Sequence, residues 1–288
     1  MTEPNPTTPP SAPPVCPRHP DQVSYVRCQR CHRPVCPTCQ RPAAVGVQCV
    51  DCVAEGAKSI RQGRTVFGGR VTDGRPQLTF GILGLTGAVY VLQMIAWSAT
   101  IGWLAFSPHV GDTQPWRFLT SALVHGNFFH IGINMYALFI IGSILEPALG
   151  RARFLALYAL GSIGGSVAIL LLASPTSNDW FRPTVGASGA VFALFGALFV
   201  LQRRLGRSST GLLVLIGINF IFPFFYPNIS WQGHLGGLVT GLIAGAVLAY
   251  LGRAPALGKP GDYSRHWLGL GALAAGLVVL AVLKYALV

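Results

Sequence analysis

Residues 185–202 read VGASGAVFALFGALFVLQ, an apolar run that opens with a serine among small residues and carries no charged side chain. A membrane-spanning helix needs about 20 mostly apolar residues, so this stretch predicts such a helix. The whole chain of 288 residues agrees, because 51% of it is hydrophobic and only 10% is charged. That composition is typical of a membrane protein.

Further apolar runs lie on both sides of this one. The predicted spans are at about 78–106, 122–145, 153–174, 185–202, 210–226, 231–251 and 267–287. We therefore expect an all-α polytopic membrane protein, with a six-helix core in residues 78–251 and a loop and seventh helix in residues 252–288. Residues 1–15 lack the basic start and apolar core of a cleavable signal peptide, so the first span is expected to direct insertion.

Lysine and arginine residues are concentrated in alternate connections between these spans. They are Arg151 and Arg153, then Arg203, Arg204 and Arg207, then Arg253, Lys259 and Arg265. Cytoplasmic loops carry such an excess, so these connections and the amino terminus are expected in the cytosol. The net charge of +12 then reflects topology, and a nucleic-acid partner is not expected because the basic residues form no single stripe.

The polar amino-terminal region has three predicted parts. Residues 1–15 are rich in Pro and Thr and are expected to be a disordered tail. Residues 16–52 contain all 7 cysteines. Residues 53–77 form a linker whose basic side chains are expected against anionic lipid head groups.

The cysteine-rich segment contains four ligand pairs, each with two intervening residues. They are Cys16 with His19, Cys28 with Cys31, Cys36 with Cys39, and Cys49 with Cys52. This spacing lets both side chains of a tight turn reach one tetrahedral metal ion, so two structural Zn²⁺ ions are predicted. A disulfide framework is the alternative, and a reducing cytosol and an odd number of thiols argue against it.

This order of ligands resembles B-box-type zinc fingers. The resemblance implies interleaved pairs, with Cys16, His19, Cys36 and Cys39 on one ion and Cys28, Cys31, Cys49 and Cys52 on the other. A sequential pairing is the open alternative. Such a module is expected to dock a protein partner rather than to catalyse a reaction.

Ser188 is the first candidate for chemistry in the membrane region. Its Gly-Ala-Ser-Gly motif alone more often serves close helix packing. The run 231–251 supplies a base in His234, and the glycines that follow it lie on the same helical face: Gly237, Gly241 and Gly245. A matching small-residue stripe lies in the run 185–202: Gly189, Ala193, Gly196 and Ala197. Packing of these stripes would bring His234 toward Ser188.

The second predicted span contributes polar side chains of its own. His130 and Asn134 are one helical turn apart, so they share a face. Their N–H groups, with the backbone N–H of Ser188, could stabilise an oxyanion in acyl transfer. An interhelical hydrogen bond is the alternative role, and it is the one we favour for His125.

Together these motifs resemble the rhomboid family of intramembrane serine proteases. The resemblance covers about residues 78–251. It is carried by Trp116-Arg117, His125, His130, Asn134, Gly186-Ala187-Ser188-Gly189, Gly233-His234-Leu235-Gly236-Gly237 and Gly241. It implies a Ser188–His234 dyad without an aspartate, an oxyanion hole that uses His130 and Asn134, and a base stacked on Phe192. The implied substrates are transmembrane segments of other proteins, cleaved without a catalytic metal near the external face.

Two features depart from the family pattern. Phe192 stands where tyrosine is frequent, and the aromatic gate is not evident, because Ile133 and Ala137 are aliphatic. Glu146 ends the second span and is expected to be structural. Two other functions compete: a proteolytically inactive rhomboid-like protein that binds membrane clients, and a transporter with intramembrane histidines, for which internal repeats would be expected.

Overall fold

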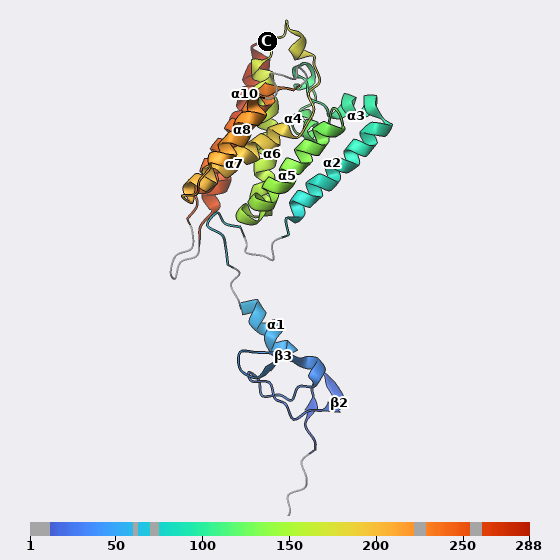
Figure 1. The fold of residues 1–288 in the computed structure, drawn as a ribbon, viewed down its shortest axis with the longest axis vertical. Coiled ribbons are helices and arrows are strands. Elements are labelled where there is room, and N and C mark those ends of the chain that lie inside the picture. Colours follow the sequence, from blue (N-terminus) through green and yellow to red (C-terminus); the bar gives the residue numbers. More distant parts are fainter. Residues whose placement is uncertain (1–11, 60–62, 70–74, 222–228, 254–260) are drawn as a thin grey trace, which may run out of the picture. The chain divides into compact units, whose positions relative to one another are not determined.

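The computed structural model describes residues 12–59, 63–69, 75–221, 229–253 and 261–288 (Figure 1). The chain divides into two compact units, Met1–Gln62 and Gly63–Val288. Most of the predicted tail, parts of the basic linker, the end of the fifth predicted span and the middle of the loop before the seventh lie outside the described residues.

The first unit is built from short strands and one helix. Its elements are β1 (Val15–Cys16), β2 (His19–Val23), the 3₁₀ helix η1 (Pro37–Cys39), β3 (Gln40–Pro42), β4 (Val47–Cys49) and α1 (Val50–Ser59). Strands β1 and β2 pair antiparallel, and so do β3 and β4. Helix α1 occupies the start of the segment predicted as linker. Asp51 in its first turn and Lys58 in its last complement the helix dipole.

The second unit is helical. Its α-helices are α2 (Gln77–Ile95), α3 (Trp97–Leu104), α4 (Arg117–Thr120), α5 (Phe128–Leu149), α6 (Arg151–Leu172), α7 (Ser188–Arg204), α8 (Thr210–Ile221), α9 (Trp231–Tyr250) and α10 (Ser264–Ala286). Its 3₁₀ helices are η2 (Pro108–Val110), η3 (Ser121–Leu123) and η4 (Asn178–Trp180). Within the described ranges, the helices α2, α5, α6, α9 and α10 are long and apolar enough to cross a membrane. Every predicted span coincides with a helix, which confirms the polytopic fold.

Several boundaries differ from the predicted ones. The first span is interrupted at Ala96, where the non-helical backbone angles, φ −131° and ψ 60°, separate α2 from α3. The second was predicted from residue 122 with His125 inside it, and this was wrong. Helix α5 begins at Phe128, because the side chain of Asn127 caps it by accepting a hydrogen bond from the His130 N–H. The fourth span starts at Ser188 rather than at residue 185.

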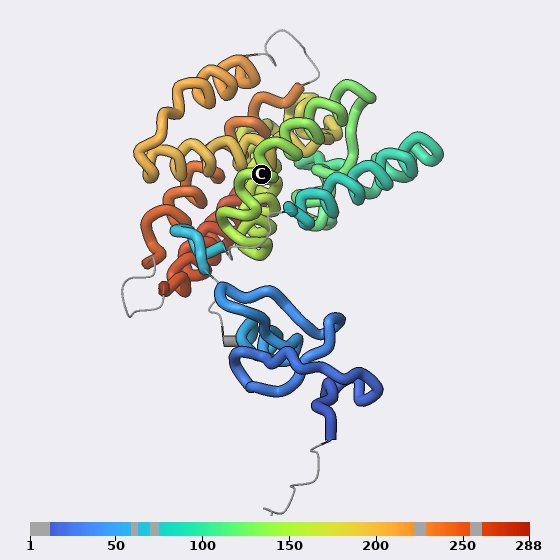
Figure 2. Tube along the Cα trace, turned by 60° about the horizontal axis from the view of Figure 1, so that its bottom comes forward, coloured from blue at the N-terminus to red at the C-terminus, as the bar shows by residue number. Residues whose placement is uncertain are grey.

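Helices α6, α7 and α9 pack against one another at the centre of the bundle. Helix α2 packs on α5 at one edge, and α8 lies at the periphery beside α7 and α9 (Figure 2). Glu146 is buried at the end of α5, and its carboxylate accepts hydrogen bonds from the N–H groups of Leu78 and Thr79. It thereby caps α2, which confirms the structural role expected for it.

Helix α10 packs on α6 and α9, and its carboxyl end is tied to two connections. The Tyr285 hydroxyl donates to the Pro108 carbonyl at 2.8 Å, and the Lys284 ammonium donates to the Ala173 carbonyl at 3.0 Å. Pro108 lies in the connection before α4, and Ala173 lies in the connection before α7. The seventh helix therefore braces the same end of the bundle as Ser188.

Candidate active site and metal centres

Helices α7 and α9 touch through their glycine-rich faces. A Cβ on Gly237 would overlap with the carbonyl oxygen of Gly189, and one on Gly241 would overlap with the backbone of Ala193. Since both clashes are with backbone, neither could be relieved by a rotamer change. The small residues allow the two backbones into direct contact, as the sequence pattern predicts.

His234 lies in the first turn of α9, and its imidazole is stacked on Phe192 of α7. The ring centroids are 4.3 Å apart and the ring planes are inclined by 15°. His234 is only 6% exposed, and its Nδ1 has no hydrogen-bond partner among the described residues. The ring is thus oriented by packing and stacking.

Ser188 is the first residue of α7 and is half-buried. The neighbouring Gly189 faces the carbonyl oxygen of Gly233, which precedes His234. The amino-terminal turns of α7 and α9 are therefore adjacent, with the serine on one and the imidazole on the other. In the described part of the chain no hydrogen bond joins the two side chains. Hydrogen bonds of this kind are often long in an enzyme without substrate.

His130 lies against the backbone that enters α7. Gly186 has a φ of +121°, and a Cβ at this position would be 2.7 Å from both Cε1 and Nε2 of the His130 ring. Only glycine fits such a backbone conformation and such a close approach. The His130 Nδ1 accepts a hydrogen bond from the Gly126 N–H at 3.3 Å. The neutral ring therefore carries its proton on Nε2, the nitrogen that faces Gly186.

Asn134 follows His130 by one turn of α5 and is 6% exposed. Its amide nitrogen donates to the His130 carbonyl at 2.8 Å, which uses one of its two hydrogens. The structure thus brings His130 close to the loop before Ser188, and it gives Asn134 a contact within its own helix.

His125 has the contacts of a structural residue. Its Nε2 accepts a hydrogen bond from the Ala187 N–H at 3.4 Å, and its backbone N–H donates to the side chain of Gln93 at 3.0 Å. The Gln93 amide donates back to the His125 carbonyl. Sequence analysis missed Gln93. The available signal was a glutamine within an apolar run, because a polar side chain in a membrane span needs a polar partner. Gln93 is fully buried in the structure.

Arg117 and Trp116 hold the connection that precedes α4. Arg117 is 7% exposed, and its guanidinium donates to the carbonyls of Ala105 and Gly102. The Trp116 indole stacks on Trp103 and donates to its carbonyl at 3.0 Å. The neighbouring Phe106 then pairs with Thr184 through two backbone hydrogen bonds. This network fixes the chain just before Gly186.

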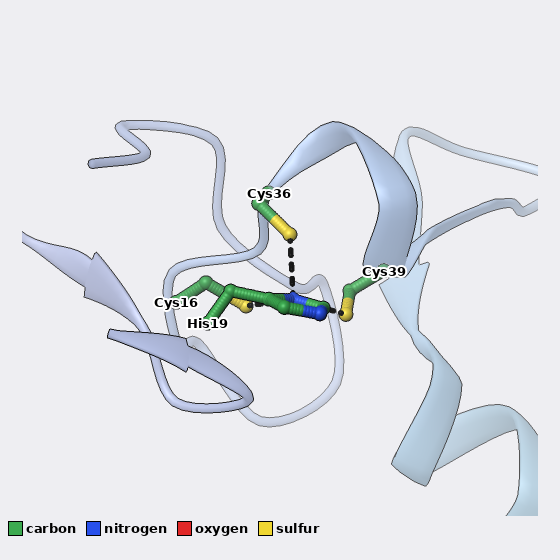
Figure 3. Close-up of side chains that lie close together, drawn as sticks. All are labelled: Cys16, His19, Cys36 and Cys39. Carbon is green, nitrogen blue, oxygen red and sulfur yellow. Dashed lines mark hydrogen bonds between the residues drawn. The ribbon is translucent and has the colours of Figure 1, made fainter. Parts of the chain in front are cut away.

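The first unit gathers its cysteines into two clusters, each with ligand atoms within 4.8 Å of one another. One contains Cys16, His19, Cys36 and Cys39 (Figure 3). The other contains Cys28, Cys31, Cys49 and Cys52. The pairs are interleaved, as the B-box resemblance implies, and the sequential alternative does not fit.

Three sulfurs surround the imidazole of His19 in the first cluster. Its Nδ1 lies 4.0 Å from the Cys16 sulfur, 3.2 Å from the Cys36 sulfur and 3.4 Å from the Cys39 sulfur. A hydrogen bond with the Cys36 backbone contributes most to lowering the pKa of the Cys16 thiol to about 6. Thiolate is the form that binds metals. Each cluster offers four soft or borderline donors, the set that a tetrahedral metal ion requires.

Comparison with known proteins places this architecture in a family. A family model described as "Rhomboid domain" matches residues 112–251. The chain is 34% identical over 198 residues to "Rhomboid protease GluP" of Bacillus subtilis (strain 168), an alignment that covers 65% of this chain and 38% of that protein. It is 31% identical over 179 residues to "Putative rhomboid protease YdcA" of the same organism, with 58% of this chain and 86% of that protein covered.

A third relative is "Rhomboid protease GlpG" of Haemophilus influenzae, 30% identical over 182 residues, which cover 59% of this chain and 90% of the relative. The matched part thus spans nearly all of GlpG and YdcA, but only 38% of GluP. The residues matched by the family model include the helices that carry His130, Ser188 and His234. The chain belongs to the rhomboid family.

Proposed function

We propose that this chain is an intramembrane serine endopeptidase with Ser188 as nucleophile and His234 as its base. The observation that carries the proposal is the stacking of His234 on Phe192 across the glycine contact between α7 and α9. That contact sets an imidazole beside the helix turn that begins with a serine. Relatives named as rhomboid proteases support the same reaction.

In the proposed reaction, His234 accepts the proton of the Ser188 hydroxyl as its oxygen attacks a substrate carbonyl. The imidazolium then gives this proton to the departing amine, which leaves an acyl-enzyme. A water molecule, deprotonated by His234, releases the acid product and restores Ser188. No aspartate is required, because the Phe192 ring and the surrounding packing orient the imidazole.

The negative charge of the tetrahedral intermediate needs hydrogen-bond donors. His130 Nε2–H is suited to this task, because the Gly126 contact to Nδ1 leaves the proton on the nitrogen next to Gly186. The backbone N–H of Ser188 and the second hydrogen of the Asn134 amide complete the proposed oxyanion hole. The Asn134 amide uses its first hydrogen for the His130 carbonyl, and a small rotation of the side chain would direct the second toward the oxyanion.

The proposed substrates are transmembrane segments of other proteins. They would approach through the bilayer between α5 and α8, while water reaches the site from the bundle end that holds Ser188. The aromatic gate of the family is not evident here, but Ile133 on α5 is 60% exposed, which is compatible with lateral access. By family analogy, cleavage follows a small residue in a helix-breaking stretch.

The distribution of lysine and arginine supports the proposed orientation, with the amino terminus in the cytosol and Ser188 toward the external face. The two clusters of the first unit would each hold a structural Zn²⁺. With four protein ligands each, they leave no open position for a substrate. We propose that this unit binds a protein partner of the protease.

The test compares the wild-type protein with Ser188→Ala in cells that make a tagged single-span substrate. We expect cleavage only with the wild type. A fluorophosphonate probe separates the inactive, client-binding alternative, because it should label the wild type and neither Ser188→Ala nor His234→Ala. Equal cleavage by wild type and Ser188→Ala would end the serine-protease proposal.

A further inference from the structure

Two arginines share one aromatic ring at the end of the helical unit opposite Ser188. The Cζ atoms of Arg64 and Arg153 lie 5.9 and 5.3 Å from the centroid of the Tyr263 ring. We refer to Arg64 and Arg153 as the arginine pair. Two positive charges beside one ring repel each other, so their placement needs an explanation.

The segment that carries Arg64 is firmly attached. The Thr65 hydroxyl donates to the Ala148 carbonyl, and the Tyr263 hydroxyl donates to the Thr65 carbonyl at 2.9 Å. Phe67 is only 4% exposed and belongs to the core of the bundle. The backbone next to Arg64 is therefore fixed on the helical bundle, which keeps Arg64 near Arg153.

Arg153 is held by neutral acceptors alone. Its Nε donates to His266 Nδ1 at 3.1 Å, and its Nη1 donates to the Gly68 and Leu149 carbonyls at 3.2 Å. Across the described ranges, neither member of the arginine pair forms an ion pair with a carboxylate. The nearby Glu146 is already engaged with the beginning of α2 and with Arg151. Among the residues that the structure describes, no carboxylate therefore neutralises the positive charge of the pair.

The arginine pair lies where a membrane-spanning helix meets the membrane surface. Arg153 is in the first turn of α6, and Trp267 in the first turn of α10 lies 5.8 Å from its Cζ. Trp267 is 46% exposed, and the next residue, Leu268, is 74% exposed. Aromatic rings of this kind are enriched at the level of lipid head groups.

We propose that Arg64, Arg153, Tyr263 and Trp267 form a binding site for the phosphate of an anionic phospholipid. Guanidinium groups bind phosphate oxygens through charge-assisted hydrogen bonds. Among the described residues, Arg153 Nη2 and the Arg64 guanidinium donate no hydrogen bond, so both are available to a phosphate. The exposed apolar surface of α10 that begins at Leu268 would contact the acyl chains. That surface favours a lipid over a soluble phosphate.

The test measures thermal unfolding of the full chain in neutral detergent during titration with phosphatidylglycerol, phosphatidylcholine or inorganic phosphate. A ligand of the folded state raises the midpoint with its concentration. We expect phosphatidylglycerol to bind best, and Arg64→Gln and Arg153→Gln to weaken it by about fivefold each. Arg64→Lys should retain most of the affinity, because it keeps the charge.

The matched control is Arg203→Gln, which removes an exposed arginine from the last turn of α7 and should leave the affinity unchanged. Arg64→Gln is the decisive variant, because within the described ranges this exposed side chain interacts with the Tyr263 ring alone, and loss of that contact does not threaten folding. The proposal is overturned if Arg64→Gln binds phosphatidylglycerol as tightly as wild type. The proposal is also overturned if phosphatidylcholine raises the unfolding midpoint as much as phosphatidylglycerol does. The same holds if inorganic phosphate raises it as much as phosphatidylglycerol does.

Discussion

The contact between α7 and α9 can be tested by adding one methyl group to it. In Gly237→Ala, the new Cβ would overlap with the carbonyl oxygen of Gly189, so the two helices would have to separate locally by about 1 Å or more. Overpacking of this kind costs about 1–3 kcal/mol of stability. A misplacement of about 1 Å between catalytic groups costs about 100-fold in rate. We therefore expect a large loss of kcat in a protein that still folds.

The assay measures kcat and KM for cleavage of a tagged single-span substrate in proteoliposomes, together with the midpoint of thermal unfolding. Gly276→Ala in α10 is the matched control, since a Cβ at that position meets no atom within 4 Å. This substitution should leave kcat unchanged and stabilise the helix by up to about 1 kcal/mol, because alanine favours helix more than glycine does.

The two glycine variants separate catalysis from folding. If Gly237→Ala retained the kcat of the wild type, the close approach of α7 and α9 would not be what sets His234 beside Ser188. If both variants lost activity equally, the loss would reflect glycine replacement in general, and the argument from helix contact would fail.

Four further predictions follow from other contacts. His130→Ala should lower kcat by about 100-fold or more with little change in KM, as loss of an oxyanion donor does, and an unchanged kcat would remove this residue from the reaction. Phe192→Leu should lower kcat by about 2- to 10-fold, because it removes the stacking energy between Phe192 and His234, whereas Phe192→Tyr should keep the wild-type rate. A zinc chelator should unfold the first unit, which would be seen as loss of protection of its amides from hydrogen exchange. Cys36→Ser should reduce the bound zinc from two ions to one, and retention of both ions would contradict the assigned cluster. Deletion of residues 1–60 should leave cleavage of the tagged substrate intact, and an inactive but folded truncation would show that the first unit takes part.

Much of the fold could be predicted from composition and periodicity. Apolar runs predict spanning helices because the bilayer sets their length, and each predicted run coincides with a helix. The ligand pairs predict two metal clusters, because a spacing of two residues reflects a local turn. The resemblance to B-boxes added the interleaved pairing that spacing alone leaves open.

The remaining differences arise from interactions that are not local in sequence. Asn127 begins α5 through a capping bond, so His125 falls in the preceding connection, which hydropathy alone does not reveal. Gln93 pairs with His125 across 32 residues, and Glu146 caps α2 across 68. The anchoring of Thr65 on Ala148 likewise turns part of a predicted linker into a packed segment.

The central claim concerns the hydroxyl of Ser188 and the imidazole that activates it. The most direct measurement is the labelling of the purified protein by a fluorophosphonate probe, with the modified residue identified by peptide mass spectrometry. The proposed mechanism predicts a single adduct on Ser188, formed by the wild type and absent in His234→Ala. Labelling at another residue, or equal labelling of wild type and His234→Ala, would contradict it.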